Sequence, residues 1–520
     1  MAFSALLTLR GLTRARLLAL PLALTLTLAA PAQAQLAASG SAAQRAATYF
    51  NSIRSQPPLL WAFLKDMPKG GDLHSHLSGA IYAESLIAWA AEGGVCVDQK
   101  TLATVKPPCN EAQGSIPAAQ ALTDGVLYRR LIDAWSMRNV AQSGLSGHDQ
   151  FFDSFGKFKL STQQRDGDML AEVAARASAG KVSYLELMLT PASAALAKVV
   201  ASSGWNDDLS SQHAALRAAG LADAVQAASA DIRHNLARQR DILGCTRQPG
   251  AAGCEVAVRI LYQVLRGLPR ETVFAQMVAG FELAQSDPNV VGLNMVMPED
   301  GMVSMRDFRQ HMRMLDYLHG AYPKGRVTLH AGELAPGLVP PEGLRFHIRE
   351  SVLTGHARRI GHGVDILQED DALGLLRRMA RDQILVEICL TSNTGILGVS
   401  GANHPMAAYL KYGVPLALAT DDEGVARSEM TAEYVKAAVE QHVDYPQLKT
   451  MARNSLQYSF AEGDSLWADA KRLRPVAACA NDRPPAARLS SSCRAYLAQH
   501  TKARLQWQLE ADLHRFESSY

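Results

Sequence analysis

The 520-residue chain has almost no net charge, and beyond its first 30 residues it has no apolar run long enough to span a membrane. Its 52 basic and 50 acidic residues leave +2 at pH 7. The first 34 residues contain three of the arginines and no acidic residue, so the remainder carries −1. This balance gives no electrostatic footprint for a nucleic-acid polymer. A small, nearly neutral ligand fits it better.

The sequence also lacks any C-x-x-C spacing, which argues against a cysteine-based zinc site or a redox motif. Six of the seven cysteines fall into local pairs, a pattern that favours disulfides and an oxidising compartment, although the sequence alone leaves other connectivities open. The natural pairs are Cys96 with Cys109, Cys245 with Cys254, and Cys479 with Cys493. Cys389 lies in an apolar, strand-like run, and we expect a buried structural thiol. The segment containing Cys96 and Cys109 is a candidate homodimerisation element.

The N-terminus has the three parts of a secretory signal peptide. Arg10, Arg14 and Arg16 precede the apolar run Leu17–Ala30, and Ala32-Gln33-Ala34 supplies a small-x-small cleavage pattern. Because the run is shorter than the ~20 residues of a membrane-spanning helix, we expect cleavage after residue 34 and a secreted or periplasmic protein. An uncleaved N-terminal anchor is the alternative.

Short β-rich runs alternate with helical stretches in the rest of the chain, which predicts an α/β fold with a parallel sheet. Eight such runs are what a (β/α)8 TIM barrel requires. We expect strands at 72–77, 184–189, 256–262, 290–296, 326–330, 359–364, 384–390 and 414–419. Helices are expected at 369–381 and 429–441, among others.

The expected organisation is a helical lead-in, one barrel domain and a C-terminal appendage. The lead-in covers residues 35–66, the barrel domain 67–466, and the appendage 467–520. Two stretches, near 95–145 and 192–253, are interpreted as insertions into the barrel.

Chemistry-bearing residues recur at the ends of four expected strands. His74 and His76 lie two apart on the first strand, so both imidazoles point to the same face and can reach one metal ion. An H-x-H pair alone is a weak signal. The corroborating motifs are His330-Ala331-Gly332-Glu333 on the fifth strand, Gly361-His362-Gly363 on the sixth, and Thr420-Asp421-Asp422 on the eighth.

These residue types suit one task. His74, His76, His330 and Asp421 form a nitrogen-rich donor set with one carboxylate, which matches Zn²⁺. Such a site retains a positive charge, which favours ionisation of a bound water, whose pKa can fall from ~15.7 to ~7. The sequence therefore predicts a zinc hydrolase whose active site opens at the carboxyl ends of the strands.

In their order and spacing, the four motifs resemble the adenosine deaminase family of amidohydrolases, and the signal peptide and cysteines resemble its secreted, growth-factor-like branch. The resemblance covers roughly residues 67–427. It implies hydrolytic deamination of a 6-aminopurine nucleoside, with zinc held by the four residues above. In that comparison Glu333 protonates purine N1, His362 orients the attacking water, and Asp422 faces purine N7 or the water.

Two positions depart from the family pattern on the substrate side. Ser78 stands where the family has an aspartate for the ribose 5′-hydroxyl, and Met297 stands where a glycine N–H meets purine N3. These departures keep an alternative open, an amidohydrolase acting on a modified or N6-substituted adenine nucleoside. A non-catalytic extracellular nucleoside-binding protein is a further alternative, which the complete donor set and Glu333 argue against.

An aromatic helical stretch, residues 151–158, resembles the apolar lid of the family. At helical spacing Phe151, Phe155 and Phe158 share one face, and core packing is the preferred interpretation over gating. The other histidines, such as His148, His213, His319, His347 and His404, have no matching context, and the sequence assigns them no role.

Overall fold

The computed structural model describes residues 40–485 and 488–520, and residues Ser41–Tyr520 form one unit. The expected signal peptide, residues 1–34, lies outside these ranges, so export remains a prediction. Within the described ranges, no helix combines the length and hydropathy that a membrane span requires.

A ring of eight parallel strands lies at the centre of this unit. The strands pair in two sheets, in the orders β1-β5-β6-β7 and β8-β9-β10-β11. Bridges between Leu293 and Val327 and between Ser75 and Asp421 join the two sheets at both edges and close the ring. The expected (β/α)8 TIM-barrel fold is therefore confirmed. The strands are β1 (Gly70–His76), β5 (Val182–Leu189), β6 (Ala257–Leu265), β7 (Val290–Val296), β8 (Thr328–Ala331), β9 (Arg359–His362), β10 (Leu385–Ile388) and β11 (Leu416–Leu418).

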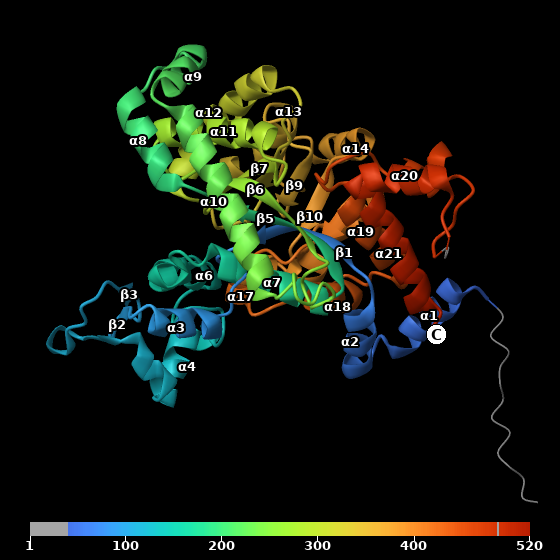
Figure 1. Ribbon diagram of the computed structural model, residues 1–520, viewed down its shortest axis with the longest axis horizontal. Coiled ribbons are helices and arrows are strands. Elements are labelled where there is room, and N and C mark those ends of the chain that lie inside the picture. The colour runs from blue at the N-terminus through green and yellow to red at the C-terminus, as the bar shows by residue number, and fades with distance from the viewer. Residues whose placement is uncertain (1–39, 486–487) are drawn as a thin grey trace, which may run out of the picture. The chain divides into compact units, whose positions relative to one another are not determined.

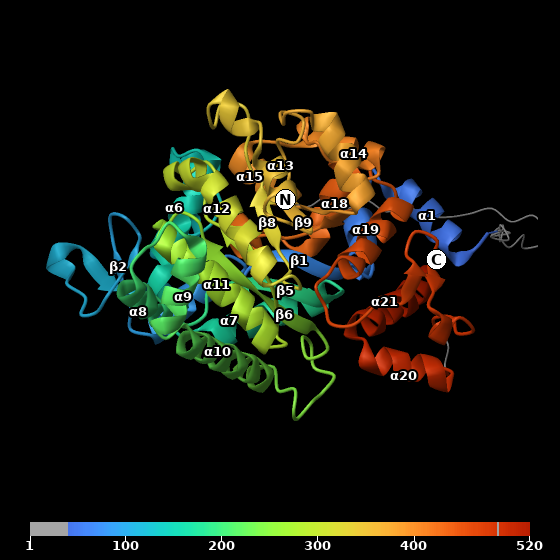
Figure 2. The same ribbon diagram turned by 90° about the horizontal axis from the view of Figure 1, so that it is seen from above.

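Helices surround the strand ring (Figures 1 and 2). α1 (Ala42–Ile53) and α2 (Pro57–Asp66) precede the first strand. The helices that follow it are α3 (Ala83–Glu92), α4 (Gly125–Ala134), α5 (Val140–Ser143), α6 (Gly147–Phe158), α7 (Asp166–Ala179), α8 (Ser193–Ser203), α9 (Leu209–Ala218), α10 (Leu221–Ile242), α11 (Arg270–Ser286), α12 (Met302–Ala321), α13 (His347–Leu353), α14 (Ala372–Asp382), α15 (Leu390–Leu397), α16 (Met406–Tyr412), α17 (Glu423–Ala426), α18 (Met430–Glu440), α19 (Tyr445–Gln457), α20 (Ser491–Gln499) and α21 (Thr501–Glu517).

Some expected strands extend past the observed ends, and the backbone explains why. The run at 359–364 ends as β9 at His362, because His362 and Gly363 adopt left-handed φ angles of 66° and 60°. The run at 384–390 ends as β10 at Ile388, because Leu390 already begins α15. β9 thus ends at His362, one of the predicted site residues, at the carboxyl end of a barrel strand.

The two expected insertions contain ordered structure of their own. The first holds a three-stranded sheet in the order β3-β2-β4, followed by α4 and α5; its strands are β2 (Cys96–Asp98), β3 (Thr104–Val105) and β4 (Ser115–Pro117). The second holds α8, α9 and α10. The boundaries of the barrel domain and of the appendage remain predictions.

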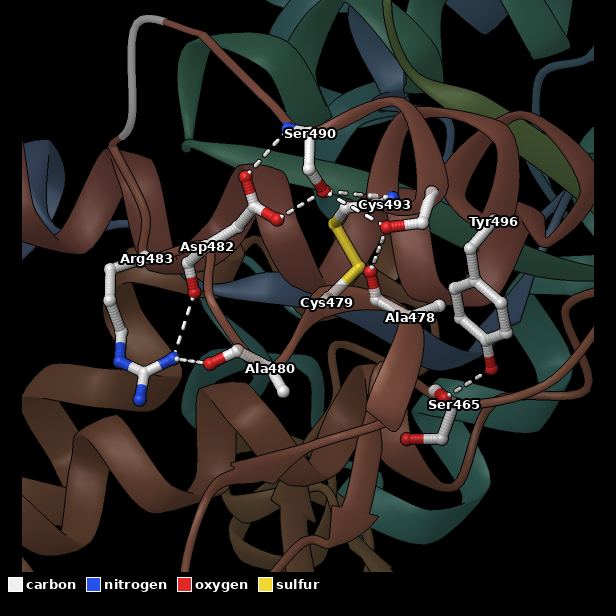
Figure 3. The surroundings of a disulfide bond; sticks show 10 residues. Ser465, Ala478, Cys479, Ala480, Asp482, Arg483, Ser490, Cys493 and Tyr496 are labelled. Carbon is white, nitrogen blue, oxygen red and sulfur yellow. Dashed lines mark hydrogen bonds between the residues drawn. A yellow bond between two sulfur atoms is a disulfide. The ribbon is translucent and has the colours of Figure 1, made fainter.

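The cysteines pair as expected. Disulfides join Cys96 to Cys109, Cys245 to Cys254, and Cys479 to Cys493, and Cys389 is a buried free thiol. Around the third disulfide, the Ser490 hydroxyl accepts the Cys493 N–H at 3.2 Å and donates to the Asp482 carboxylate at 2.6 Å (Figure 3). This serine therefore caps α20 at the point where the disulfide attaches it.

The last helix, α21, packs against barrel strands. Leu505, Leu509 and Leu513 are buried in one cluster with strand residues. Those strand residues are Leu73 on β1, Tyr184 on β5, Leu385 on β10 and Ala417 on β11. Burial of three leucine side chains contributes roughly 5–9 kcal/mol by transfer free energy, which ties the C-terminal segment to the barrel.

A buried arginine connects the strands inside the barrel. Arg359 begins β9 and contacts carboxylates on two other strands, with its Nη2 2.5 Å from Glu186 Oε2 and its Nε 2.5 Å from Glu387 Oε1. The Tyr184 hydroxyl and the Phe460 N–H also donate to Glu186, at 2.8 Å and 2.5 Å. Because each charge has a partner and further hydrogen bonds, the network can tolerate full burial.

We expect Arg359→Met to lower the free energy of unfolding by ~3–5 kcal/mol, because it leaves two buried carboxylates without a cation. Urea denaturation followed by circular dichroism measures the change. Arg378→Met is the matched control, because Arg378 pairs with Asp382 at an exposed position and should change stability by less than ~1 kcal/mol. Equal effects of the two substitutions would contradict the assigned role of the network.

Candidate active site

Four metal-binding side chains converge at the carboxyl ends of the strands. His74 Nε2 lies 3.0 Å and His76 Nε2 3.1 Å from His330 Nε2, and Asp421 Oδ1 lies 3.3 Å from His76 Nε2. Each residue offers one donor atom, and these atoms all lie within 4.8 Å of one another. Three ring nitrogens and a carboxylate that face one point fit a shared cation. The four residues are thus a candidate metal site.

Backbone conformation brings Asp421 to this point. It follows β11 with a φ of 58°, a left-handed value that turns the chain out of the strand. Its N–H donates to His74 O at 2.8 Å, and the His76 N–H donates to Asp421 O at 3.2 Å. The bridge that closes the barrel between β1 and β11 therefore also sets the distance from Asp421 to the two histidines.

Neighbouring oxygen atoms hold the other ring nitrogen of each histidine. His74 Nδ1 donates to Glu387 Oε2 at 2.8 Å. His76 Nδ1 donates to Gln263 Oε1 at 3.1 Å, and His330 Nδ1 donates to Asn294 Oδ1 at 3.0 Å. With the proton on Nδ1, each Nε2 presents its lone pair to the common point.

The sequence-based prediction includes no role for these three partners, although the sequence contains a signal for them. Glu387, Gln263 and Asn294 are isolated polar residues inside apolar strands β10, β6 and β7. A buried polar group in such a strand needs a hydrogen-bond partner, which marks it for attention. The sequence cannot say which histidine each one holds.

Glu333 lies in the loop after β8, and only 8% of it is exposed. Burial, which disfavours the carboxylate form, raises the pKa of Glu333 to about 8. The group can therefore hold a proton near neutral pH, as a general acid must.

A chain of hydrogen bonds fixes the tautomer of His362. The Met406 N–H donates to His404 Nδ1 at 3.2 Å, so the His404 proton is on Nε2, which donates to Asn393 Oδ1 at 3.1 Å. The Asn393 amide then donates to His362 Nδ1 at 3.0 Å. The proton of neutral His362 is consequently on Nε2, 3.6 Å from Glu333 Oε1. His404, to which the sequence assigned no role, is therefore part of this series of hydrogen bonds.

Asp422 lines the same cavity beside the metal donors. It follows the left-handed turn at Asp421. Asp422 Oδ1 is buried and has no hydrogen-bond partner among the described residues. Its position requires a glycine at residue 79, where a Cβ atom would lie 1.5 Å from Asp422 Oδ1.

The donor cluster and these acids open into a cavity of about 380 Å³, a size suited to a small molecule. Its lining residues are His76, Ser78, Phe151, Phe152, Phe155, Gln263, Met297, Pro298, His330, Glu333, Asp421 and Asp422. The expected aromatic face is confirmed, because the Phe155 ring lies 5.5 Å from that of Phe151 and 5.4 Å from that of Phe158 between centroids. Phe158 is buried outside the cavity, and Phe152 lines it together with Phe151 and Phe155. α6 therefore contributes apolar surface to the cavity.

Met297 occupies a backbone position that favours glycine. Its φ is 84°, an uncommon value for a residue with a side chain. Arg266 Nε donates to Met297 O at 3.0 Å, and Arg266 Nη1 donates to His330 O at 3.1 Å, so one buried arginine holds both strand ends. Met297 is 37% exposed and packs on Gly267, where a Cβ atom would lie 2.7 Å from Met297 Cε.

The barrel and the donor cluster at its strand ends define the class of metal-dependent amidohydrolases. The family model described as adenosine deaminase matches residues 139–468, well over half of the chain. The chain belongs to the adenosine deaminase family.

Curated relatives support the same assignment over shorter stretches. The adenosine deaminase of Serratia proteamaculans is 38% identical over 136 residues, which is 26% of this chain and 38% of the relative. That of Clostridium acetobutylicum is 32% identical over 143 residues, 27% of this chain and 40% of the relative. The match therefore spans about two fifths of the length of these relatives.

Solved structures share the fold at lower identity. The apo N6-methyl-AMP deaminase of Arabidopsis thaliana is 21% identical with a TM-score of 0.50, and the match covers 80% of this chain and 97% of that one. The Arabidopsis ADAL structure complexed with GMP is also 21% identical with a TM-score of 0.50, covering 79% and 97%. At this identity the likeness shows the fold alone.

We expect Glu387→Gln to weaken zinc binding by about 10–100-fold, because the amide no longer supplies a charged acceptor to His74 Nδ1. Isothermal titration of metal-free protein with zinc measures the affinity. Glu342→Gln, at an exposed position, is the control and should leave the affinity unchanged. Wild-type affinity in Glu387→Gln would show that the contact does not orient His74.

Proposed function

We propose that the protein catalyses zinc-dependent hydrolytic deamination of adenosine or deoxyadenosine to the corresponding inosine nucleoside and ammonia. The observation that carries this proposal is a buried Glu333, with a pKa raised by burial, beside a four-residue metal donor set in one cavity. An acid and a metal site in the same small cavity are what hydrolysis at a ring C–N bond requires.

We assign the metal to His74, His76, His330 and Asp421, and we infer that it is zinc. Three neutral imidazoles and one carboxylate match the donor preferences of Zn²⁺. When bound, the ion supplies Lewis-acid activation of a water molecule near neutral pH. A second set of possible donors, His362 and Cys389 with His74 and Asp421, shares two residues with the first. Because the Asn393 amide donates to His362 Nδ1 and the ring proton is on Nε2, neutral His362 offers no free lone pair to a metal, which favours the first set.

Glu333 is assigned as the general acid. Its protonated carboxyl group donates to purine N1, which makes C6 more electrophilic as water adds there. The Nε2–H of His362 points toward the same region and donates to the oxygen of the attacking water, so His362 orients the nucleophile. The low pKa of His362, about 3 because of burial, keeps the ring neutral in this role.

The remaining lining groups are assigned to the rest of the nucleoside. Asp422, with Oδ1 buried and unpartnered among the described residues, faces purine N7. The Met297 N–H serves purine N3, and the Ser78 hydroxyl serves a ribose hydroxyl. The cavity lining contains no lysine or arginine among the described residues and has three carboxyl groups. This composition favours a nucleoside over a nucleotide, since a phosphate would lack a cation there.

A second candidate is a modified or N6-substituted adenine nucleoside. Ser78 and Met297 favour it, because both line the cavity and both depart from the family pattern on the side that would contact the substrate. One of the Arabidopsis proteins of similar fold is an N6-methyl-AMP deaminase. Comparing kcat/KM for adenosine and N6-methyladenosine separates the two candidates.

Export is part of the proposal. Residues 1–34 have the pattern of a signal peptide, and the three disulfides support folding in an oxidising compartment. Dimerisation through the segment of Cys96 and Cys109 remains a prediction.

We expect the zinc-loaded protein to release ammonia from adenosine, and Glu333→Gln to lower kcat by about 10²–10⁴-fold with KM changed little, because the amide cannot protonate N1. A coupled ammonia assay over a nucleoside panel measures both. Chelation should abolish the activity, and Glu342→Gln should retain it. If zinc-loaded protein consumes no 6-aminopurine nucleoside, the proposed function is wrong.

The pH dependence follows from the same group. Glu333 acts when protonated, so kcat/KM should fall as the pH rises through the pKa of about 8. Initial rates from pH 6 to about 10 at low adenosine concentration report this limb. A profile that stays flat through this range would contradict the assignment of Glu333 as the acid.

A further inference from the structure

Glu299 is a buried carboxylate that lies behind the loop carrying Glu333. It follows β7 and is 1% exposed. Glu299 Oε1 accepts the Gly332 N–H at 3.1 Å, and Glu299 Oε2 accepts the Glu333 N–H at 2.8 Å. The two oxygens thus fix two consecutive peptide groups, including the one from which the Glu333 side chain extends.

His347 anchors this carboxylate from the other side. Its Nδ1 donates to Glu299 Oε1 at 2.6 Å, and its ring stacks on Phe308 with centroids 3.9 Å apart and planes 6° from parallel. Both His347 and Glu299 are buried. A short hydrogen bond from a stacked ring leaves Glu299 little freedom to move.

The conformation of the loop needs such support. Gly332 has a φ of 74°, and a Cβ atom there would lie 2.5 Å from Asp365 Oδ1 and 2.7 Å from Ile348 Cδ1. The chain therefore turns sharply within a crowded space directly before Glu333. Without Glu299 as the acceptor, the N–H groups of Gly332 and Glu333 would be buried without a hydrogen bond.

Several charged groups surround Glu299. Although burial opposes ionisation, the hydrogen bond and charge of His347 and the charge of Arg266 lower the pKa of Glu299, so it carries a negative charge. Asp365 and Glu369 also face it, and burial raises the pKa of both, which favours their neutral forms. The charge on Glu299 in turn helps raise the pKa of Glu333, after burial and Asp421.

We propose that Glu299, anchored by His347, is the positioning residue of Glu333 and holds its carboxyl group in place beside the metal donors, where it can protonate purine N1. This inference rests on the proposed role of Glu333. Glu299 acts on the reaction by holding Glu333 and does not itself contact the substrate.

A simpler role for Glu299, neutralising Arg266, does not account for the geometry. Among the described residues, Arg266 donates to the carbonyls of Met297 and His330, and both oxygens of Glu299 accept from the loop of Glu333. The arginine and the carboxylate therefore hold different segments of the site.

The test compares Glu299→Gln with Glu369→Gln. Glu369 is the control, because it is a buried glutamate near the same loop. It accepts two consecutive N–H groups at the start of α13, those of Ile348 at 2.6 Å and Arg349 at 3.2 Å, but both at its Oε1. A glutamine offers one acceptor oxygen in place of two. Glu299→Gln therefore loses a contact in the loop of Glu333, whereas Glu369→Gln can keep both of its contacts on its one remaining oxygen.

For Glu299→Gln we expect kcat to fall by about 100-fold, because a displacement near 1 Å of a reacting group has an effect of that size. KM should change by less than about threefold and one zinc should remain bound, because the substrate contacts and donor set are intact. The alkaline limb of kcat/KM should move to lower pH, since a negative charge near Glu333 is removed. In Glu369→Gln, kcat and the limb should stay at wild-type values.

Crystal structures of the two variants supply a readout that needs no activity. We expect the Glu333 carboxyl group to shift relative to His330 and His362 in Glu299→Gln and to keep its place in Glu369→Gln. An unmoved Glu333, or equal kinetic effects in both variants, would overturn the inference. If the wild-type protein deaminates no nucleoside, the proposed function fails separately, and the position of Glu333 still decides the positioning role.

Discussion

Arg359 lies buried between two carboxylates inside the barrel, and the candidate metal site depends on this arrangement. Its guanidinium holds Glu387 at 2.5 Å, and the other oxygen of Glu387 accepts the Nδ1 proton of His74 at 2.8 Å. The charge that orients the first metal donor is thus itself held by a cation fixed on another strand. Buried ionic groups of this kind are tolerated only as a complete set, so the barrel interior and the site constrain each other.

Polar neighbours also fix the other groups of the site. A polar side chain on a barrel strand holds each histidine, and the chain from Met406 through His404 and Asn393 sets the tautomer of His362. Glu299 then fixes the loop of Glu333. Each of these groups has one tautomer or orientation because a neighbouring polar group imposes it. Such preorganisation is what catalysis by fixed donors and acceptors requires.

The fold and the donor set could be predicted from the sequence because their signals are local. An H-x-H pair lies within one strand, and apolar strands with chemistry-bearing ends repeat along the chain. The partners could not be predicted, because they are single polar residues whose contacts span long separations, 313 residues between His74 and Glu387. The backbone angles could not be predicted from the sequence either. The left-handed φ of Asp421 and of Met297 follows from how the strands end, and the motif letters do not encode it.

In the proposed metal site, His74, His76, His330 and Asp421 hold one zinc ion. Anomalous diffraction from a crystal of the zinc-loaded protein, recorded on both sides of the zinc absorption edge, tests it directly. We expect a single strong peak among the four donor atoms, at zinc-ligand distances of ~2.0–2.2 Å. A peak shared by His362 and Cys389, or no zinc peak near these residues, would contradict it.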